Sequence, residues 1–151
     1  SSSSAASDVY KRQKQYEDRL ASWANFRSTL EDSKDPIKDA IDFFNKAPLV
    51  NIQTDPYTPS SWPDPWELIK ENTYCPFVKI LAICYTLQLT DVLSTVNYEI
   101  HITHDNKKSS TYYLLYVGDR VIGFKEGTHV QSNQLPNSII SHHEYPMPAL
   151  H

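Results

Sequence analysis

The stretch from Pro76 to about Leu89 constrains the fold most, because it is apolar on nearly every side of a helix. One stripe of this helix consists of Phe77, Ile80, Leu81, Cys84 and Leu87. Its other sides carry Val78, Ile83 and Tyr85. A helix that is apolar almost all round is buried at the centre of a domain. Cys75 directly precedes Pro76, a residue suited to the first helical position, so the sequence places a thiol at the start of the central helix.

Three further helices are expected before this one. Apolar residues at helical spacing predict a helix from Gln15 to Leu30 that buries one side. Asp35 caps a second helix, which begins with Pro36 and ends before a Pro-rich connector, residues 48–63. A short third helix begins at Asp64-Pro65, a second pair of cap residue and proline.

Three strands and a tail are expected after it. Residues 96–103 alternate between apolar and polar, and residues 111–117 are apolar on both faces, as in a central strand. Gly118-Asp119 is a two-residue hairpin turn that leads into a third strand over residues 120–124. The prediction is an α+β fold: an N-terminal helical pair, and a central buried helix packed on a small antiparallel three-stranded sheet. The tail is expected to lie over the core.

The chain of 151 residues fits one domain. We expect a helical pair with its connector over residues 14–59, a core over 60–126 and a tail over 127–151. Residues 3–13 match the in-frame translation of a transposon-based sequencing adapter. This match implies an assembled environmental sequence, so residues 1–13 are taken as adapter-derived and expected to be disordered or idle.

Charge and hydropathy exclude several classes of partner. A formal net charge of −4 without a basic stripe argues against nucleic acid. No apolar run approaches the ~20 residues of a membrane span, and no signal-peptide pattern is present. Adjacent histidines at His142-His143 point to opposite sides of an extended chain, so with Glu144 they do not predict a metal site. We expect no metal and no cofactor.

The two cysteines are expected to be free thiols. Cys75 and Cys84 lie nine positions apart on one helix, which places their Cα atoms about 13 Å apart, too far for a disulfide. Cys84 is expected to be an inert core residue. Cys75 has two interpretations: a small apolar residue at the helix start, or a nucleophile whose thiolate the helix dipole favours.

The aromatic residues before Cys75 form the second candidate site. Trp62 and Trp66 flank the start of the third helix, and Tyr74 directly precedes the cysteine. The tryptophans are interpreted either as packing anchors that set the entry of the chain or as a ligand-stacking platform. With Tyr74 they make up a candidate binding surface, because tyrosine and tryptophan are common interface anchors.

These features together resemble the core of transglutaminase-like cysteine proteins, which are related to papain-like enzymes. The resemblance covers about residues 62–124 and rests on the element order, the Trp62 to Leu68 segment and Tyr74-Cys75. It implies that Cys75 occupies the nucleophile position. The histidine position falls near residues 111–113 and the acid position near residues 124–126.

This chain departs from that family's pattern at both supporting positions. It has no histidine over residues 111–113, and Glu126 is the only acid near the second position. A cysteine without a base lacks general-base activation. Other histidines that could serve as a base are His101, His104 and His129.

The segments 62–68, 83–90 and 112–124 also resemble proteins of large contractile-tailed marine bacteriophages. This second resemblance implies a viral origin and a place in the virion or the host cytoplasm. The function expected is therefore a non-catalytic transglutaminase-like contact module, bound to other phage or host proteins in tail or neck assembly. The alternative is an active cysteine hydrolase or acyl-transferase that uses Cys75 with one of the three histidines.

Overall fold

The computed structural model describes residues 2–51 and 53–150. Its α-helices are α1 (Ser2–Leu30), α2 (Pro36–Asn45), α3 (Pro65–Glu71) and α4 (Pro76–Gln88). Its short 3-10 helices are η1 (Pro59–Ser61), η2 (Asp91–Leu93) and η3 (Ser132–Gln134). Its strands are β1 (Tyr98–Asp105), β2 (Ser110–Val117), β3 (Arg120–Ile122), β4 (His129–Gln131) and β5 (Ile139–Pro146). The α+β class and the four helices are those expected.

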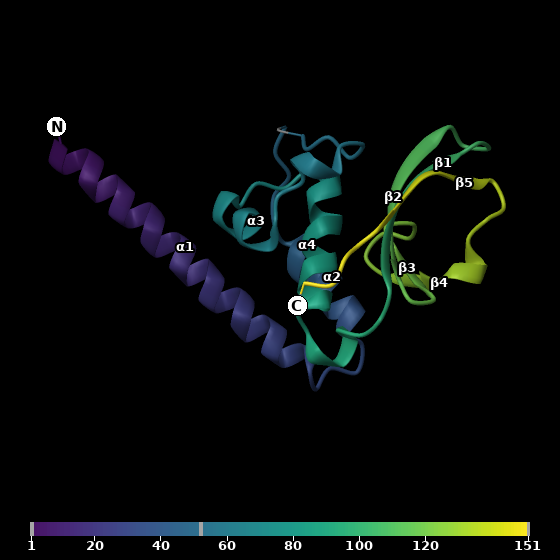
Figure 1. The fold of residues 1–151 in the computed structure, drawn as a ribbon, viewed down its shortest axis with the longest axis horizontal. Coiled ribbons are helices and arrows are strands. Elements are labelled where there is room, and N and C mark those ends of the chain that lie inside the picture. Colours follow the sequence, from purple (N-terminus) through teal and green to yellow (C-terminus); the bar gives the residue numbers. More distant parts are fainter. Residues whose placement is uncertain (1, 52, 151) are drawn as a thin grey trace.

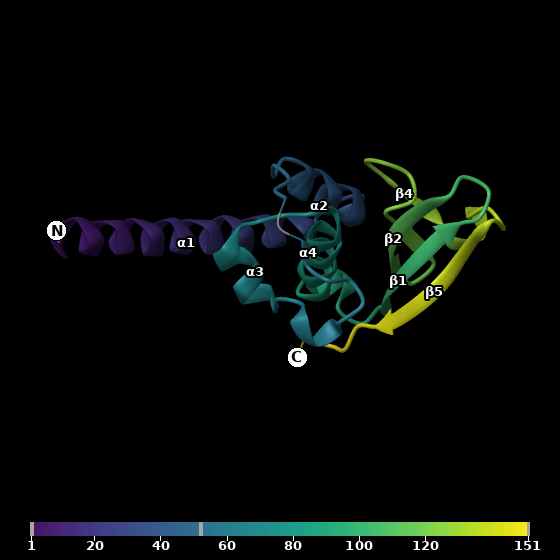
Figure 2. The ribbon, with the colours of Figure 1, turned by 90° about the horizontal axis from the view of Figure 1, so that it is seen from above.

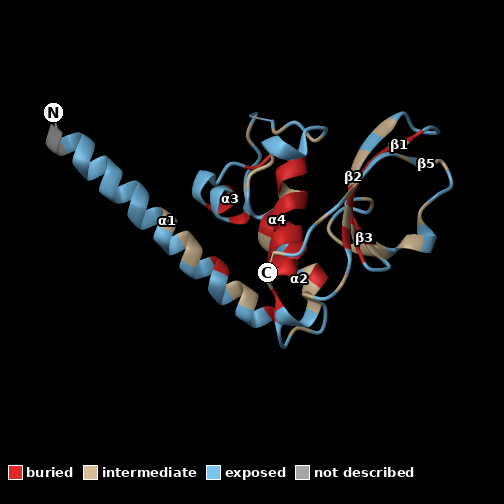
Figure 3. Ribbon diagram, viewed as in Figure 1, coloured by how far each residue is buried: buried red, intermediate tan, exposed pale blue. Residues whose placement is uncertain are grey.

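Helix α4 lies between α3 and the sheet, as Figures 1 and 2 both show. Eleven of its thirteen residues are buried, and Figure 3 shows it buried along almost its whole length. Only Pro76 and Lys79 are not buried. The prediction of a central helix that is apolar all round is confirmed.

The buried polar groups of α4 are all bonded, which is what lets a helix lie this deep. The Thr86 hydroxyl donates to the Ala82 carbonyl (2.7 Å) and accepts from the Trp23 indole N–H (2.9 Å). Gln88 accepts from the Cys84 thiol (3.5 Å) and donates to the Pro148 carbonyl (3.0 Å). These bonds attach α1 and the C-terminal tail to the central helix.

The sheet has five antiparallel strands in the order β4-β3-β2-β1-β5, not the three expected. The tail does not simply lie over the core. It contributes β4, which pairs with β3, and β5, which pairs with the free edge of β1. β4 has three residues, too few to show an alternating pattern. β5 contains a register shift opposite Ile102 and Thr103, which breaks the period-two pattern that identifies a strand.

Helix α1 begins at Ser2 and not at Gln15. Residues 1–13 were expected to be disordered or idle; residues 2–13 are not disordered but continue the helix, and Ser1 lies outside the described residues. Extending a formed helix costs little, because the unfavourable nucleation step has already occurred. Residues 4–15 are all exposed, and Figure 3 shows this end of α1 projecting into solvent. The adapter origin remains a prediction.

The cap and turn predictions are confirmed. The Asp35 carboxylate accepts from the Lys38 amide (3.1 Å), and the Asp64 carboxylate accepts from the Glu67 amide (2.8 Å). Gly118 in the hairpin turn has φ +59°, a conformation that favours glycine. Within residues 2–51 and 53–150, no helix is both long and apolar enough to cross a membrane.

Truncation of a side chain inside α4 tests its central place. Leu81 is fully buried, so Leu81→Ala should lower the free energy of unfolding by about 2–5 kcal/mol in urea titrations. Leu49→Ala is the matched control, because Leu49 is 56 % exposed and should change stability by less than about 0.5 kcal/mol. Equal effects at the two positions would contradict the central place of α4 in the core.

Deletion of residues 2–13 tests whether this segment is structurally idle. Since its described side chains are exposed, the melting temperature should change by less than about 2 °C. Leu20→Ala provides the comparison, because Leu20 packs against the core and its truncation should lower the melting temperature. A deletion as damaging as Leu20→Ala would show that the segment stabilises the fold.

Candidate functional site

Cys75 is the N-cap residue of α4. It is 1 % exposed, and its carbonyl accepts from the Lys79 amide (3.1 Å). Among the residues that the structure describes, none donates or accepts a hydrogen bond at the Cys75 sulfur. The thiol is therefore placed where the sequence predicted, at the helix start, but it is closed off from solvent and lacks a polar partner.

Tyr113 occupies the region where the family resemblance puts a histidine. Its ring packs edge-on against Phe77 of α4 at 5.4 Å between centroids. Burial, followed by the negative charges that Tyr57 and Cys75 can carry, raises the pKa of Tyr113. A phenol with a raised pKa keeps its proton at neutral pH, so it does not act as a base toward the neighbouring thiol.

His101 lies on the other face of the sheet from α4. Its strand neighbour Ile100 belongs to the same core cluster as Cys75, and successive residues of a strand point to opposite faces. The His101 ring packs against the Tyr116 ring with 4.1 Å between centroids and a tilt of 32°. Its Nδ1 is 3.0 Å from the Ser141 hydroxyl. This arrangement directs the imidazole away from Cys75.

His129 is held by two other side chains. The Arg120 guanidinium donates from Nε to His129 Nδ1 (2.8 Å), so the proton on the ring is at Nε2 and is donated to Asp35 (2.9 Å to each oxygen). With Nδ1 already an acceptor for Arg120, neither nitrogen is free to take a proton from Cys75. No local sequence pattern indicates this triad, because Asp35 lies 94 positions from His129 in the chain.

His104 has no hydrogen bond to Cys75 in the described part of the chain. It lies near the end of β1, where its ring approaches that of His142 on β5 at 6.3 Å between centroids. The structure thus brings none of the three candidate histidines into hydrogen-bond contact with the candidate nucleophile.

The candidate binding surface is only partly exposed. Tyr74 is 5 % exposed, so the expectation that it takes part in a contact surface is wrong: its ring packs against Phe44 in the core. Trp62 donates from its indole N–H to the Asp55 carbonyl (3.1 Å) and packs against Phe77. Trp66 is 49 % exposed and touches Trp23 edge-on. Trp62 is mainly an anchor, and Trp66 presents a face to solvent.

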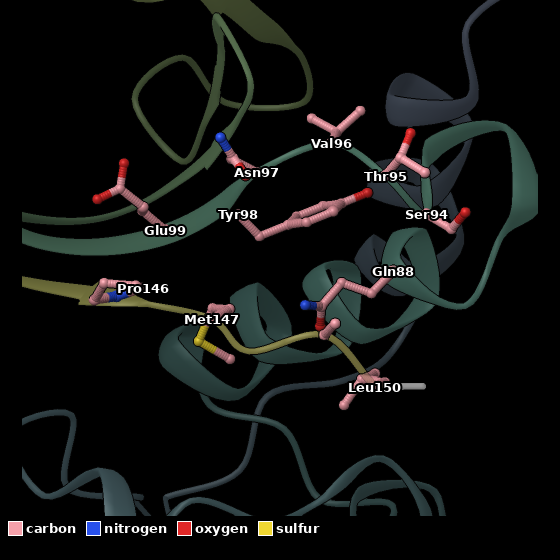
Figure 4. A pocket seen from close by; sticks show the side chains of 11 residues that line it. Gln88, Ser94, Thr95, Val96, Asn97, Tyr98, Glu99, Pro146, Met147 and Leu150 are labelled. Carbon is pink, nitrogen blue, oxygen red and sulfur yellow. The ribbon is translucent and has the colours of Figure 1, made fainter.

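Cys75 lines neither of two cavities that lie beside α4. One, of about 640 Å³, lies between α4, β2 and the loop after β3, and Glu126 is on its wall. The other, of about 420 Å³, lies between the end of α4, the segment before β1 and the tail. Figure 4 shows the Tyr98 ring on its wall reaching toward Ser94. These walls offer few groups that could perform acid–base chemistry.

Comparison with known proteins identifies the fold. No family model matches the chain, and no curated protein matches it. The structure is similar to that of Legionella pneumophila LapG in its calcium-bound form, with a TM-score of 0.57 and 16 % sequence identity. The match covers 91 % of this chain and 83 % of LapG. LapG has a transglutaminase-like cysteine protease fold. The chain therefore has a transglutaminase-like fold, as its sequence resemblance implied.

Removal of the Asp35 carboxylate should weaken the fold in a pH-dependent way. Partial burial alone would raise the pKa of Asp35, but hydrogen bonds from His129 and the Lys38 amide and the charge of Arg120 together lower it. Because its pKa is lowered in the folded protein, the ionised Asp35 carboxylate stabilises the fold at pH values above its pKa in the unfolded chain. This stabilisation is lost as the pH falls through the pKa of Asp35 in the folded protein. Asparagine caps a helix as well as aspartate does, so Asp35→Asn removes only the charged contact to His129 and Arg120. It should cost less than about 1 kcal/mol at neutral pH and nothing at strongly acid pH, as measured by urea unfolding.

The matched control is Asp42→Asn, a change on the exposed face of the same helix. Its effect should be smaller, because exposed ion pairs contribute little. A cost for Asp35→Asn that persists undiminished into acid would contradict the role assigned to the carboxylate.

Proposed function

We propose that this chain is a non-catalytic transglutaminase-like domain that acts as a protein–protein contact module. Because the chain resembles phage proteins, we extend the proposal to virion assembly, in the tail or neck. The single observation that carries the loss of catalysis is the isolation of Cys75: the sulfur is buried, and no ring nitrogen within the described residues contacts it.

Three further features support loss of catalysis. Tyr113 replaces the histidine expected beside the thiol, and its pKa is raised, so it stays protonated at neutral pH. His129 is committed to Arg120 and Asp35. His101 belongs to the opposite face of the sheet. A thiol nucleophile needs a base within about 2.6–3.2 Å in a productive arrangement.

The surface best suited to a partner lies around the entry to α3. Trp66 exposes half of its surface, and its chain neighbours Pro65 and Glu67 line a groove of about 390 Å³. This groove is lined by Trp62, Tyr145 and Met147 together with prolines 59, 63, 65, 146 and 148. Rigid aromatic and proline side chains lose little conformational entropy when a partner binds, which favours their use in contacts.

Thiol alkylation distinguishes the contact module from an active hydrolase. Full-length protein is treated with iodoacetamide between about pH 6 and pH 8, and labelling of each cysteine is followed by mass spectrometry. Cys75 and Cys84 should both react slowly in the folded protein, because both are buried. Both should react rapidly in urea. Fast, selective labelling of folded Cys75 below pH 7 would contradict the proposal and favour the hydrolase.

Tyr113→His supplies a gain-of-reactivity control. An imidazole at this position would stand where the family's histidine is expected and should accelerate labelling of Cys75 relative to the wild-type chain. Tyr112→His is the matched variant, because the Tyr112 ring contacts Phe124 and not the Cys75 region. Similar behaviour of the two variants would show that residue 113 is not beside the thiol in solution.

A further inference from the structure

One cluster of ligand-type side chains lies outside the Cys75 region, on the sheet face away from α4. Glu99, His101 and Glu144 each offer one ligand atom within 4.8 Å of the others. Glu99 and His101 are two positions apart on β1, so they share a face, and Glu144 on β5 is the direct partner of His101. In Figure 4 the Glu99 side chain extends away from Tyr98, its neighbour on the opposite face.

The bulge in β5 completes this cluster. Residues 141 and 144 would point to opposite faces of a regular strand, because they are three positions apart. The register shift pairs Ser141 with Thr103 and Glu144 with His101, so both side chains reach the His101 face. Ser141 can then bond the Nδ1 of His101 at 3.0 Å, while a carboxylate oxygen of Glu144 lies 3.9 Å from the same nitrogen.

His101 has an unsatisfied nitrogen inside this cluster. The residue is 8 % exposed, and its Nε2 is buried without a hydrogen-bond partner. The nearest acidic oxygen, from Glu99, is 3.8 Å from Nε2, beyond hydrogen-bond range. An orphaned buried polar atom costs about 1–3 kcal/mol, so its persistence calls for a ligand.

We propose that Glu99, His101 and Glu144 form a binding site for a divalent transition-metal ion of the zinc type. With Nδ1 donating to Ser141, the Nε2 lone pair is available to the ion, as in histidine ligands whose other nitrogen is held by a polar partner. One imidazole and two carboxylates, without sulfur, suit Zn²⁺ better than Ca²⁺ or Mg²⁺, which prefer oxygen ligands alone.

The surroundings match this assignment. The Tyr116 ring packs against His101 and limits its rotation. Tyr116 is also the direct strand partner of Glu99, so its side chain lies beside the cluster. The two glutamate side chains are 44 % and 58 % exposed, so they can rotate inward to the ~2.0–2.2 Å that a zinc–oxygen bond requires. The remaining coordination positions face solvent and would hold water.

Titration calorimetry with Zn²⁺ on the full chain without an affinity tag tests the proposal. We expect saturable one-to-one binding, a Zn²⁺-dependent rise in melting temperature, and no competition from equimolar Ca²⁺. Glu99→Gln and Glu144→Gln should each weaken binding by more than about tenfold. Both residues are partly exposed, so these variants should fold. Co²⁺ loading should give a visible absorption band that each variant loses.

His142→Gln is the matched control, because His142 is an exposed histidine on the same strand outside the cluster. It should retain wild-type affinity. The proposal is overturned if wild-type protein shows no saturable Zn²⁺ binding, if His142→Gln weakens binding as much as Glu144→Gln does, or if Ca²⁺ competes on equal terms.

Discussion

Helix α4 buries eleven of its thirteen residues, and α2, α3, η2 and β2 pack against it. Helix α3 lies on one side of α4 and the sheet on the other, as Figures 1 and 2 show. Helix α2 also packs on α4, and its cap residue Asp35 bonds to His129 of β4. A helix this deep is stable only if its few polar groups are bonded inside the protein. Thr86 and Gln88 meet this condition through Trp23 and Pro148, and the same bonds tie down α1 and the tail.

The burial that stabilises α4 also accounts for the state of Cys75. The thiol stands at the first turn of the helix, a position that can activate a cysteine. In this chain Tyr113 and Phe77 form an aromatic contact in the same region, where a catalytic cysteine would require an imidazole. A transglutaminase-like fold is thus retained while its candidate nucleophile is packed as a core residue.

The sheet separates the molecule into two chemical environments. Its face toward α4 is apolar and carries Tyr98 and Ile100, whereas its other face gathers His101, Tyr116 and the carboxylates of Glu99 and Glu144. Alternation along β1 is what keeps these environments apart. Because of this alternation, His101 points away from Cys75 and lies beside the carboxylates of Glu99 and Glu144.

Much of the fold could be predicted from local patterns. The two Asp-Pro helix starts, the Gly118-Asp119 turn and the apolar α4 each depend on a few neighbouring residues, and the structure confirms them. β4 and β5 were missed because one is very short and the other contains a bulge that interrupts its alternation. The burial of Tyr74 was missed because its ring packs against Phe44, thirty positions earlier in the chain.

The sequence by itself determined which helix is central, where Cys75 stands on it, and which residues of β1 share a face, because these properties follow from helical and strand periodicity. Only the tertiary structure decided which side chains meet. Pairing of β5 with β1 brings Glu144 to His101, and packing of α2 near β4 brings Asp35 to His129. Such contacts join residues tens of positions apart, so no local pattern records them.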